Sequence, residues 1–185
     1  MPELDSIGLV ELSSVAVGYL AEDAMLKAAP VELLQARTIC SGKYIVVVGG
    51  DVAGVTAAVE GGAAVATGAL IEQRVIPHIH QSVFPAVSLA VDLGEPEGAL
   101  GVIETFSASS IIEVADAAAK TADVLLLRVH LAMALGGKGF VLLTGDVASV
   151  EAAVAAGCEV AAADGILTGR AVIPAPRREL FRDMI

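Results

Sequence analysis

The sequence predicts an α/β (α+β) fold made of two ferredoxin-like domains in tandem. The main observation is an internal repeat: IGLVELSS at residues 7–14 returns as LGVIETFS at residues 100–107, and GKYIVVVGGDVAGVTAAVEGG at 42–62 returns as GKGFVLLTGDVASVEAAVAAG at 137–157. Within each copy, short runs of Val, Ile and Leu alternate with longer Ala-rich segments, as strands and helices do. A repeat of this length indicates one domain present twice.

Each element of the first copy follows from its local pattern, and the second copy repeats the order. Apolar residues at helical spacing predict the helices, Ser41-Gly42 predicts a turn between two strands, and Gly49-Gly50-Asp51 opens the second helix. The elements expected in order are a strand at 7–12, a helix at 14–29, strands at 31–40 and 43–49, a helix at 51–66 and a strand that ends at Pro77. This order, β-α-β-β-α-β, is the split βαβ arrangement of ferredoxin-like folds.

The segment PAVSLAVDLGEPEG, residues 85–98, combines Pro, Gly and acidic residues where the first copy ends, and it is expected to be a linker. We therefore assign a first domain to residues 1–93 and a second domain to residues 94–185. The tail from Arg177 alternates charged and apolar residues at helical spacing. This pattern predicts a helix that docks on the domain surface.

The composition excludes several classes of protein. The 185 residues are 56% hydrophobic but only 3% aromatic, and their mean hydropathy is +0.76, so we expect large subunit interfaces and an oligomer. A formal charge of -11 gives nucleic acid no electrostatic footing. Charged residues interrupt the apolar runs and the N-terminus lacks the pattern of a secretory signal, so a cytoplasmic protein with no membrane partner is expected.

Four motifs in each copy resemble the bacterial microcompartment shell domain. They are the opening GLVEL or GVIET, the helix end DAMLKAA or DAAAKTA, the strand that runs into Gly-Asp-Val-Ala, and the closing Val-Ile-Pro. The tandem is similar to shell proteins that assemble as homotrimers with a pseudo-hexameric outline. The resemblance implies a structural role beside other shell proteins, in a microcompartment shell within the cytoplasm. No catalytic triad, paired-carboxylate pocket or phosphate loop stands out, so we do not expect an enzyme.

The turn at Cys40, Ser41 and Gly42 is the candidate site. Its motif TICSGK, together with DAMLKAA, HLAMALGGK and IHQSVFPA, resembles the tandem shell proteins of propanediol-utilisation compartments. That resemblance implies that residues 38–43 and 132–138 line a central pore, and that Cys40 of three chains holds one [4Fe-4S] cluster per trimer. A single cysteine needs this symmetry, because iron-sulfur clusters generally take four ligands. Such a site would suit electron transfer across the shell, with an encapsulated or cytosolic redox enzyme as a partner, or the export and repair of clusters.

Other interpretations stay open. Cys40 could pack as a small apolar side chain, or it could ring a gated pore for small metabolites without a cluster. The chain could also be a soluble ligand-binding or sensor protein unrelated to a shell. Cys158, at the end of an Ala-rich helix, is expected in the core. Lys27 and Lys120 match the edge lysine of shell hexagons, but the usual partner positions hold other residues, namely Pro30, Asp123, His78 and Ala175.

Several remaining residues are given structural roles. Asp51 and Asp146 precede helices and are predicted to be N-caps rather than parts of a phosphate loop. Glu11 and Glu104 recur in equivalent strands, which favours a structural role in both copies. The remaining expectations concern histidines: His78 and His80 at surface contacts rather than in a metal site, and His130 beside the pore or an interface.

Overall fold

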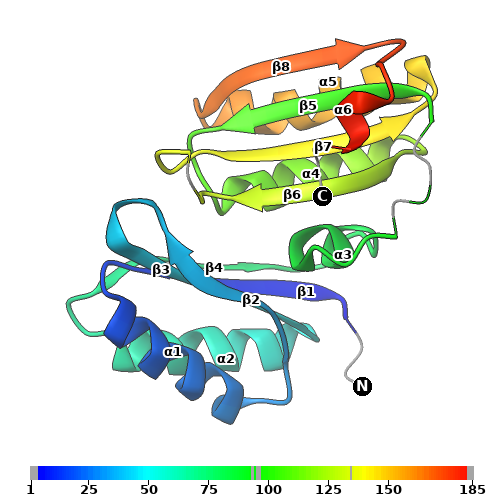
Figure 1. Ribbon diagram of the computed structural model, residues 1–185. Helices are drawn as coiled ribbons and strands as arrows, with labels where there is room; N and C mark the ends of the chain where they lie inside the picture. Colours follow the sequence, from blue (N-terminus) through cyan, green and yellow to red (C-terminus); the bar gives the residue numbers. More distant parts are fainter. Residues whose placement is uncertain (1–3, 93, 95–96, 134, 183–185) are drawn as a thin grey trace. The chain divides into compact units, whose positions relative to one another are not determined.

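The structure of the protein is a computed structural model that describes residues 4–92, 94, 97–133 and 135–182 (Figure 1). The chain divides into two compact units, Met1–Phe84 and Pro85–Ile185. Each unit is a four-stranded antiparallel sheet with two helices on one of its faces (Figure 1). The strand orders are β2-β3-β1-β4 and β6-β7-β5-β8. This arrangement confirms the predicted tandem of ferredoxin-like domains.

The helices and strands agree closely with the segments expected from the sequence. The first unit contains β1 (Ser6–Leu12), α1 (Val15–Ala28), β2 (Glu32–Ile39), the 3-10 turn η1 (Cys40–Gly42), β3 (Lys43–Gly50), α2 (Val52–Val65) and β4 (Leu70–Ile76), followed by α3 (Val83–Ser88). The second unit contains β5 (Ala99–Thr105), α4 (Ser110–Thr121), β6 (Leu125–Leu131), β7 (Gly139–Gly145), α5 (Val147–Ala163), β8 (Leu167–Ile173) and α6 (Glu179–Arg182).

The duplication extends to the irregularities of the sheets. The register of β1 with β4 shifts between Glu11 and Leu12, and the register of β5 with β8 shifts at the equivalent Glu104 and Thr105. A second shift recurs between β2 and β3 and between β6 and β7. The two copies therefore share the positions of their register shifts, where a strand bends and its side chains are redirected.

The glycine that opens each repeat lets a helix approach the sheet closely. A Cβ at Gly8 would lie 2.6 Å from Cγ2 of Val59 in α2, and a Cβ at Gly101 would lie 2.9 Å from Cγ2 of Val154 in α5. Real Cβ atoms essentially never come so close to a neighbour. The glycine of the motif GLVEL or GVIET is therefore a packing requirement.

The second helix of each unit begins at a capping aspartate, as predicted. The Oδ1 atom of Asp51 accepts a hydrogen bond from the backbone N–H of Gly54 at 2.6 Å, and Oδ1 of Asp146 accepts one from the N–H of Ser149 at 3.0 Å. The hydrogen bonds to Ser149 hold the pKa of the Asp146 carboxyl below its usual value. Both carboxylates thus serve the helix, and neither belongs to a phosphate loop.

The segment predicted to be a linker begins in a helix, which corrects that expectation. In α3 the side chains of Val83, Phe84, Ala86 and Val87 are buried. Pro85 falls in the first turn of α3, where a helix tolerates proline. The sequence pattern treated this proline as a break, but the burial of its apolar neighbours decides the local structure.

An equivalent short helix follows the second copy. Phe181 of α6 is buried against Leu100 and Leu127, at the position that Phe84 occupies in the first unit beside Gly49. The predicted surface-docked tail helix is confirmed for residues 179–182, and residues 183–185 lie outside the described part of the chain. Among the helices described, none combines the length and apolar character needed to cross a membrane.

Candidate functional site

Cys40 lies at the tip of the β2–β3 hairpin. The strands pair as far as Ile39 and Lys43, which face each other across the turn, and Cys40, Ser41 and Gly42 form the 3-10 turn between them. Ser41 and Gly42 have φ values of 65° and 73°, in the left-handed region that glycine adopts most readily. Cys40 is partly exposed and the next two residues are exposed, so the turn is accessible in the single chain.

The two cysteines have different environments, and neither forms a disulfide. Cys158 in α5 is only 4% exposed. Burial raises the pKa of the Cys158 thiol, and the neighbouring Arg170 guanidinium partly opposes this rise. The expectation that Cys158 belongs to the core is confirmed, and the accessible thiol is that of Cys40.

The described residues of one chain do not assemble a metal site by themselves. Within residues 4–92, 94, 97–133 and 135–182, no group of three or more His, Cys, Asp or Glu side chains is arranged to hold a metal ion. A cluster at Cys40 would therefore need the same residue from further chains.

Two side chains anchor the base of the Cys40 hairpin. The Nζ atom of Lys43 lies 2.7 Å from Oε1 of Glu11 in β1. The hydroxyl of Tyr44 donates a hydrogen bond to Oε2 of Glu22 in α1 at 2.9 Å. Burial raises the pKa of Tyr44, and the Glu22 carboxylate raises it further. The expected structural role of Glu11 is confirmed by its ion pair, and a second anchor, Tyr44, appears beside it.

The anchor at Tyr44 was missed from the sequence, although a signal was present. A Cβ at Gly18 of α1 would lie 2.5 Å from Cδ1 of Tyr44. In the second copy the sizes are exchanged: Ile111 stands at the position of Gly18, and a Cβ at Gly139 would lie 2.8 Å from Cγ2 of Ile111. A comparison of the two copies for such exchanges would have paired these positions.

The equivalent turn of the second copy is longer and carries no thiol. It spans residues 132–138, between the facing pair Leu131 and Gly139, and it contains no cysteine. Ala134 lies outside the described residues. Lys138 reaches Glu104 at 3.6 Å, in an ion pair that is more open than its counterpart in the first copy.

His130 holds the start of this second turn. Its Nε2 atom lies 2.8 Å from the carbonyl oxygen of Met133, and its ring stacks on Phe140 with centroids 4.7 Å apart. The side chain is buried. His130 therefore contacts the second candidate pore turn directly, and its place beside a pore or an interface stays a prediction.

The other histidines lie at the surface, as expected. Nδ1 of His78 lies 3.4 Å from Oδ1 of Asp5, and Nδ1 of His80 lies 2.8 Å from the Ser82 hydroxyl. Both histidines are exposed. The edge lysines occupy exposed ends of helices, where each pairs with an aspartate one turn earlier, Lys27 with Asp23 and Lys120 with Asp116, at 2.6 Å in both cases.

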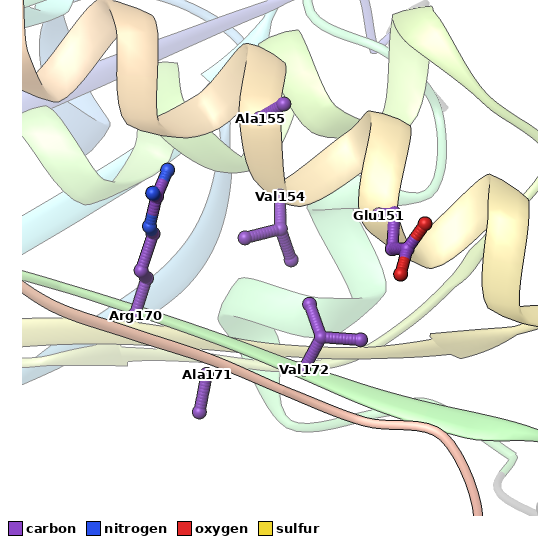
Figure 2. A pocket seen from close by; sticks show the side chains of 6 residues that line it. All are labelled: Glu151, Val154, Ala155, Arg170, Ala171 and Val172. Carbon is purple, nitrogen blue, oxygen red and sulfur yellow. The ribbon is translucent and has the colours of Figure 1, made fainter.

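Two hollows on the surface of the second unit are formed by described residues. One, of about 440 Å³, lies on the sheet face opposite the helices and is lined by Val102, Glu104, Leu135, Lys138, Gly139, Phe140 and Leu142. The other, of about 270 Å³, lies between α5 and β8. Figure 2 shows Arg170 and Val172 extending from β8 toward α5, with Val154 reaching back from the helix.

Comparison with known families identifies the repeated unit. The model of the BMC domain matches residues 6–79 and matches again at residues 99–176. The chain belongs to the BMC domain family. The two matched ranges contain every strand of the two sheets and both candidate pore turns.

Similar proteins are named as components of microcompartments or carboxysomes. The bacterial microcompartment shell protein PduT of Citrobacter freundii is 42% identical over 180 residues, which cover 97% of each chain. The carboxysome assembly protein CcmO of Synechocystis is 33% identical over 94% of this chain and 62% of its own length. The crystal structure of a microcompartment protein from Desulfitobacterium hafniense DCB superposes with a TM-score of 0.93, at 49% identity over 97% of this chain and 99% of that one.

These similarities show that the BMC-domain chain is a structural shell protein of a bacterial microcompartment. The expected resemblance, fold and place in a shell are confirmed. The relatives are named as shell proteins, which agrees with the expectation of a role other than catalysis.

Proposed function

We propose that the chain forms a homotrimeric shell tile in which three Cys40 thiolates hold one [4Fe-4S] cluster at a central pore. The observation that carries this proposal is the position of Cys40 on an accessible turn, whereas the equivalent turn of the second copy, residues 132–138, has no cysteine. A chain with one such thiol supplies three to a trimer. Three thiolates leave one ligand position of a four-iron cluster for water, a small molecule or a partner.

The residues of the turn fit this role. Cys40 is partly exposed and forms no disulfide, and cysteine is the residue that most iron-sulfur clusters take as a ligand. Gly42 has no side chain to crowd a shared axis, and Ser41, the next residue after Cys40, supplies a hydroxyl and a backbone N–H, groups of the kind that tune bound clusters. A [4Fe-4S] cluster, when bound, accepts and donates single electrons. The chain would thereby provide an electron path through the shell to a redox partner.

Exposed apolar surface on each unit supports the trimer. On α1 of the first unit, Tyr19 and Leu20 are 62% and 61% exposed. On the second unit, the sheet face opposite the helices is partly exposed at Val102, Glu104, Phe140 and Leu142.

The chain thus exposes one apolar helix face, on the first unit, and one hollowed sheet face, on the second. A second copy that placed its helix face on this sheet face would make a head-to-tail contact. Contacts of this type close into a ring when the rotation allows it. Three copies would complete a ring of six domains, with the Cys40 turns of alternate domains around the axis.

Anaerobic purification tests this proposal. The wild type is expected to sediment as a trimer, to contain about four irons per trimer, and to absorb broadly near ~400 nm as iron-thiolate sulfide centres do. Cys40→Ser should remain a trimer and lose the iron and the absorption. The matched control is Cys158→Ser, which changes the buried cysteine and should keep the iron.

The alternatives give different results. A trimer without iron in the wild type would favour a gated pore for small metabolites. A monomer or dimer would contradict the ring, and iron retained in Cys40→Ser would contradict the assignment of the ligand.

A further inference from the structure

We propose that the two anchors below the Cys40 turn are positioning residues for the cysteine. In this view Glu11 acts through Lys43, and Glu22 acts through Tyr44. Together they fix the hairpin so that the thiols of three chains reach a common point. The inference rests on the proposed function for its ligand, and it assigns roles to residues that never touch that ligand.

The two anchors hold the hairpin from opposite faces of the sheet. Lys43 and Tyr44 are consecutive in β3, so their side chains point to opposite faces. Lys43 meets Glu11 on the face away from the helices, at 2.7 Å. Tyr44 packs among the residues under the helices and meets Glu22 of α1 at 2.9 Å. Lys43 also pairs with Ile39 where the turn begins. The strand that leaves the turn is therefore fixed by contacts on both faces of the sheet.

The second copy provides an internal comparison, because it has the same hairpin without the cysteine. There the ion pair between Lys138 and Glu104 measures 3.6 Å, and the Glu104 side chain is 43% exposed, against 9% for Glu11. Gly139 stands where the first copy has Tyr44. Both anchors are thus tight in the copy that carries a thiol, and one is loose and the other missing in the copy without it.

Tyr19 adds a connection to assembly. The centroid of its ring lies 5.1 Å from that of the Tyr44 ring. Tyr19 thus contacts Tyr44 and remains exposed in the single chain. In the proposed ring, this face of α1 packs on the next copy. Exclusion of water strengthens a buried hydrogen bond, so assembly would tighten the anchor between Tyr44 and Glu22.

The experiment compares variants of the anchors in the full chain. Tyr44→Phe removes one hydroxyl without a change of charge, and Glu11→Gln removes the charge that holds Lys43. Glu104→Gln makes the same change in the copy that lacks a cysteine and is the matched control. Three quantities are measured: iron per trimer after anaerobic purification, the rate at which iodoacetamide alkylates Cys40 in iron-free protein, and the midpoint of thermal unfolding.

Both anchor variants are expected to bind less iron and to be alkylated about tenfold faster, since loss of a hydrogen bond to a charged group shifts a local opening equilibrium by that order. Glu104→Gln should match the wild type in iron and in alkylation, whatever its midpoint. Lys43→Arg should keep both quantities near the wild-type values, because a guanidinium also pairs with Glu11.

The inference is overturned if Tyr44→Phe and Glu11→Gln match the wild type in iron and alkylation, or if Glu104→Gln changes them equally. Failure of the proposed function looks different. A wild type without iron would remove the cluster, while the alkylation rates of the same variants would still decide whether the anchors hold the Cys40 turn.

Discussion

The first unit packs Gly18 against Tyr44, and the second packs Ile111 against Gly139 at the equivalent positions. This exchange of side-chain sizes predicts that one substitution in the first unit compensates for the other. We consider the variant Gly18→Ile/Tyr44→Gly, which gives the first unit the pair found in the second, together with its two single changes. Tyr44 is buried against α1. Gly18 sits where a Cβ would be 2.5 Å from the Tyr44 ring. Each single change should therefore be damaging for a different reason.

The magnitudes follow from packing. Tyr44→Gly empties a buried aromatic site, and removal of such rings costs about 3–5 kcal/mol of unfolding free energy. Gly18→Ile drives a side chain into the Tyr44 ring, and overpacking of this kind costs about 1–3 kcal/mol or more. In the double variant the isoleucine occupies the space that the ring vacates. We expect the pair to be about 2–3 kcal/mol more stable than additivity predicts, the upper range for residues in contact.

Urea unfolding of all four proteins at one protein concentration measures this coupling, because assembly makes stability depend on concentration. Additive free energies would refute the packing argument. The double variant should still lack the hydroxyl that reaches Glu22. It should therefore regain stability without regaining slow alkylation of Cys40.

Two further predictions concern a helix cap and pH. Asp51→Ala should lower the unfolding free energy by about 1 kcal/mol, as loss of a helix N-cap does, while Asp51→Ser should keep most of that stability. Thermal unfolding measures both variants. Equal midpoints for Asp51→Ala and the wild type would contradict a stabilising role of the cap. Burial raises the pKa values of the Cys158 thiol and the Tyr44 hydroxyl above their usual 9.0 and 10.0, so the folded state keeps these protons longer than the unfolded state. The contribution of these two groups to stability should thus be constant below about pH 8.5 and should fall as pH rises above 9.0 and then above 10.0. Urea unfolding of wild type and Cys158→Ala over the alkaline range checks this, and the variant should lack the earlier part of the fall.

Most of the fold could be predicted because its determinants are local. The helices α1 and α2 each begin directly after a capping residue, Ser14 and Asp51 respectively. The spacing of Ala and Val in the helices is the same in both copies. The helix α3 was missed because its formation depends on burial of Phe84 and its neighbours, which no local pattern reports. A proline in the first helical turn looks the same in sequence as one that ends a helix.

The candidate site was predictable only in part, for the same physical reason. The turn at Cys40 is local, since its left-handed residues follow one another directly. The contact of Tyr44 with Glu22 joins residues from different elements, and its geometry depends on how α1 lies over β3. A repeat partly overcomes this limit, because compensating exchanges between copies mark residues that touch.

The duplication itself explains why one turn could specialise. In a ring of six identical domains, a cysteine at the turn would bring six thiols to one axis, more than a four-iron cluster binds. Fusion of two copies lets the alternate turns diverge. The first turn has a short loop, a thiol and two anchors, and the second is longer, has no thiol and has a longer ion pair. The proposed three-fold site therefore depends on differences between copies whose folds are the same, which is why the tightness of the anchors follows the cysteine.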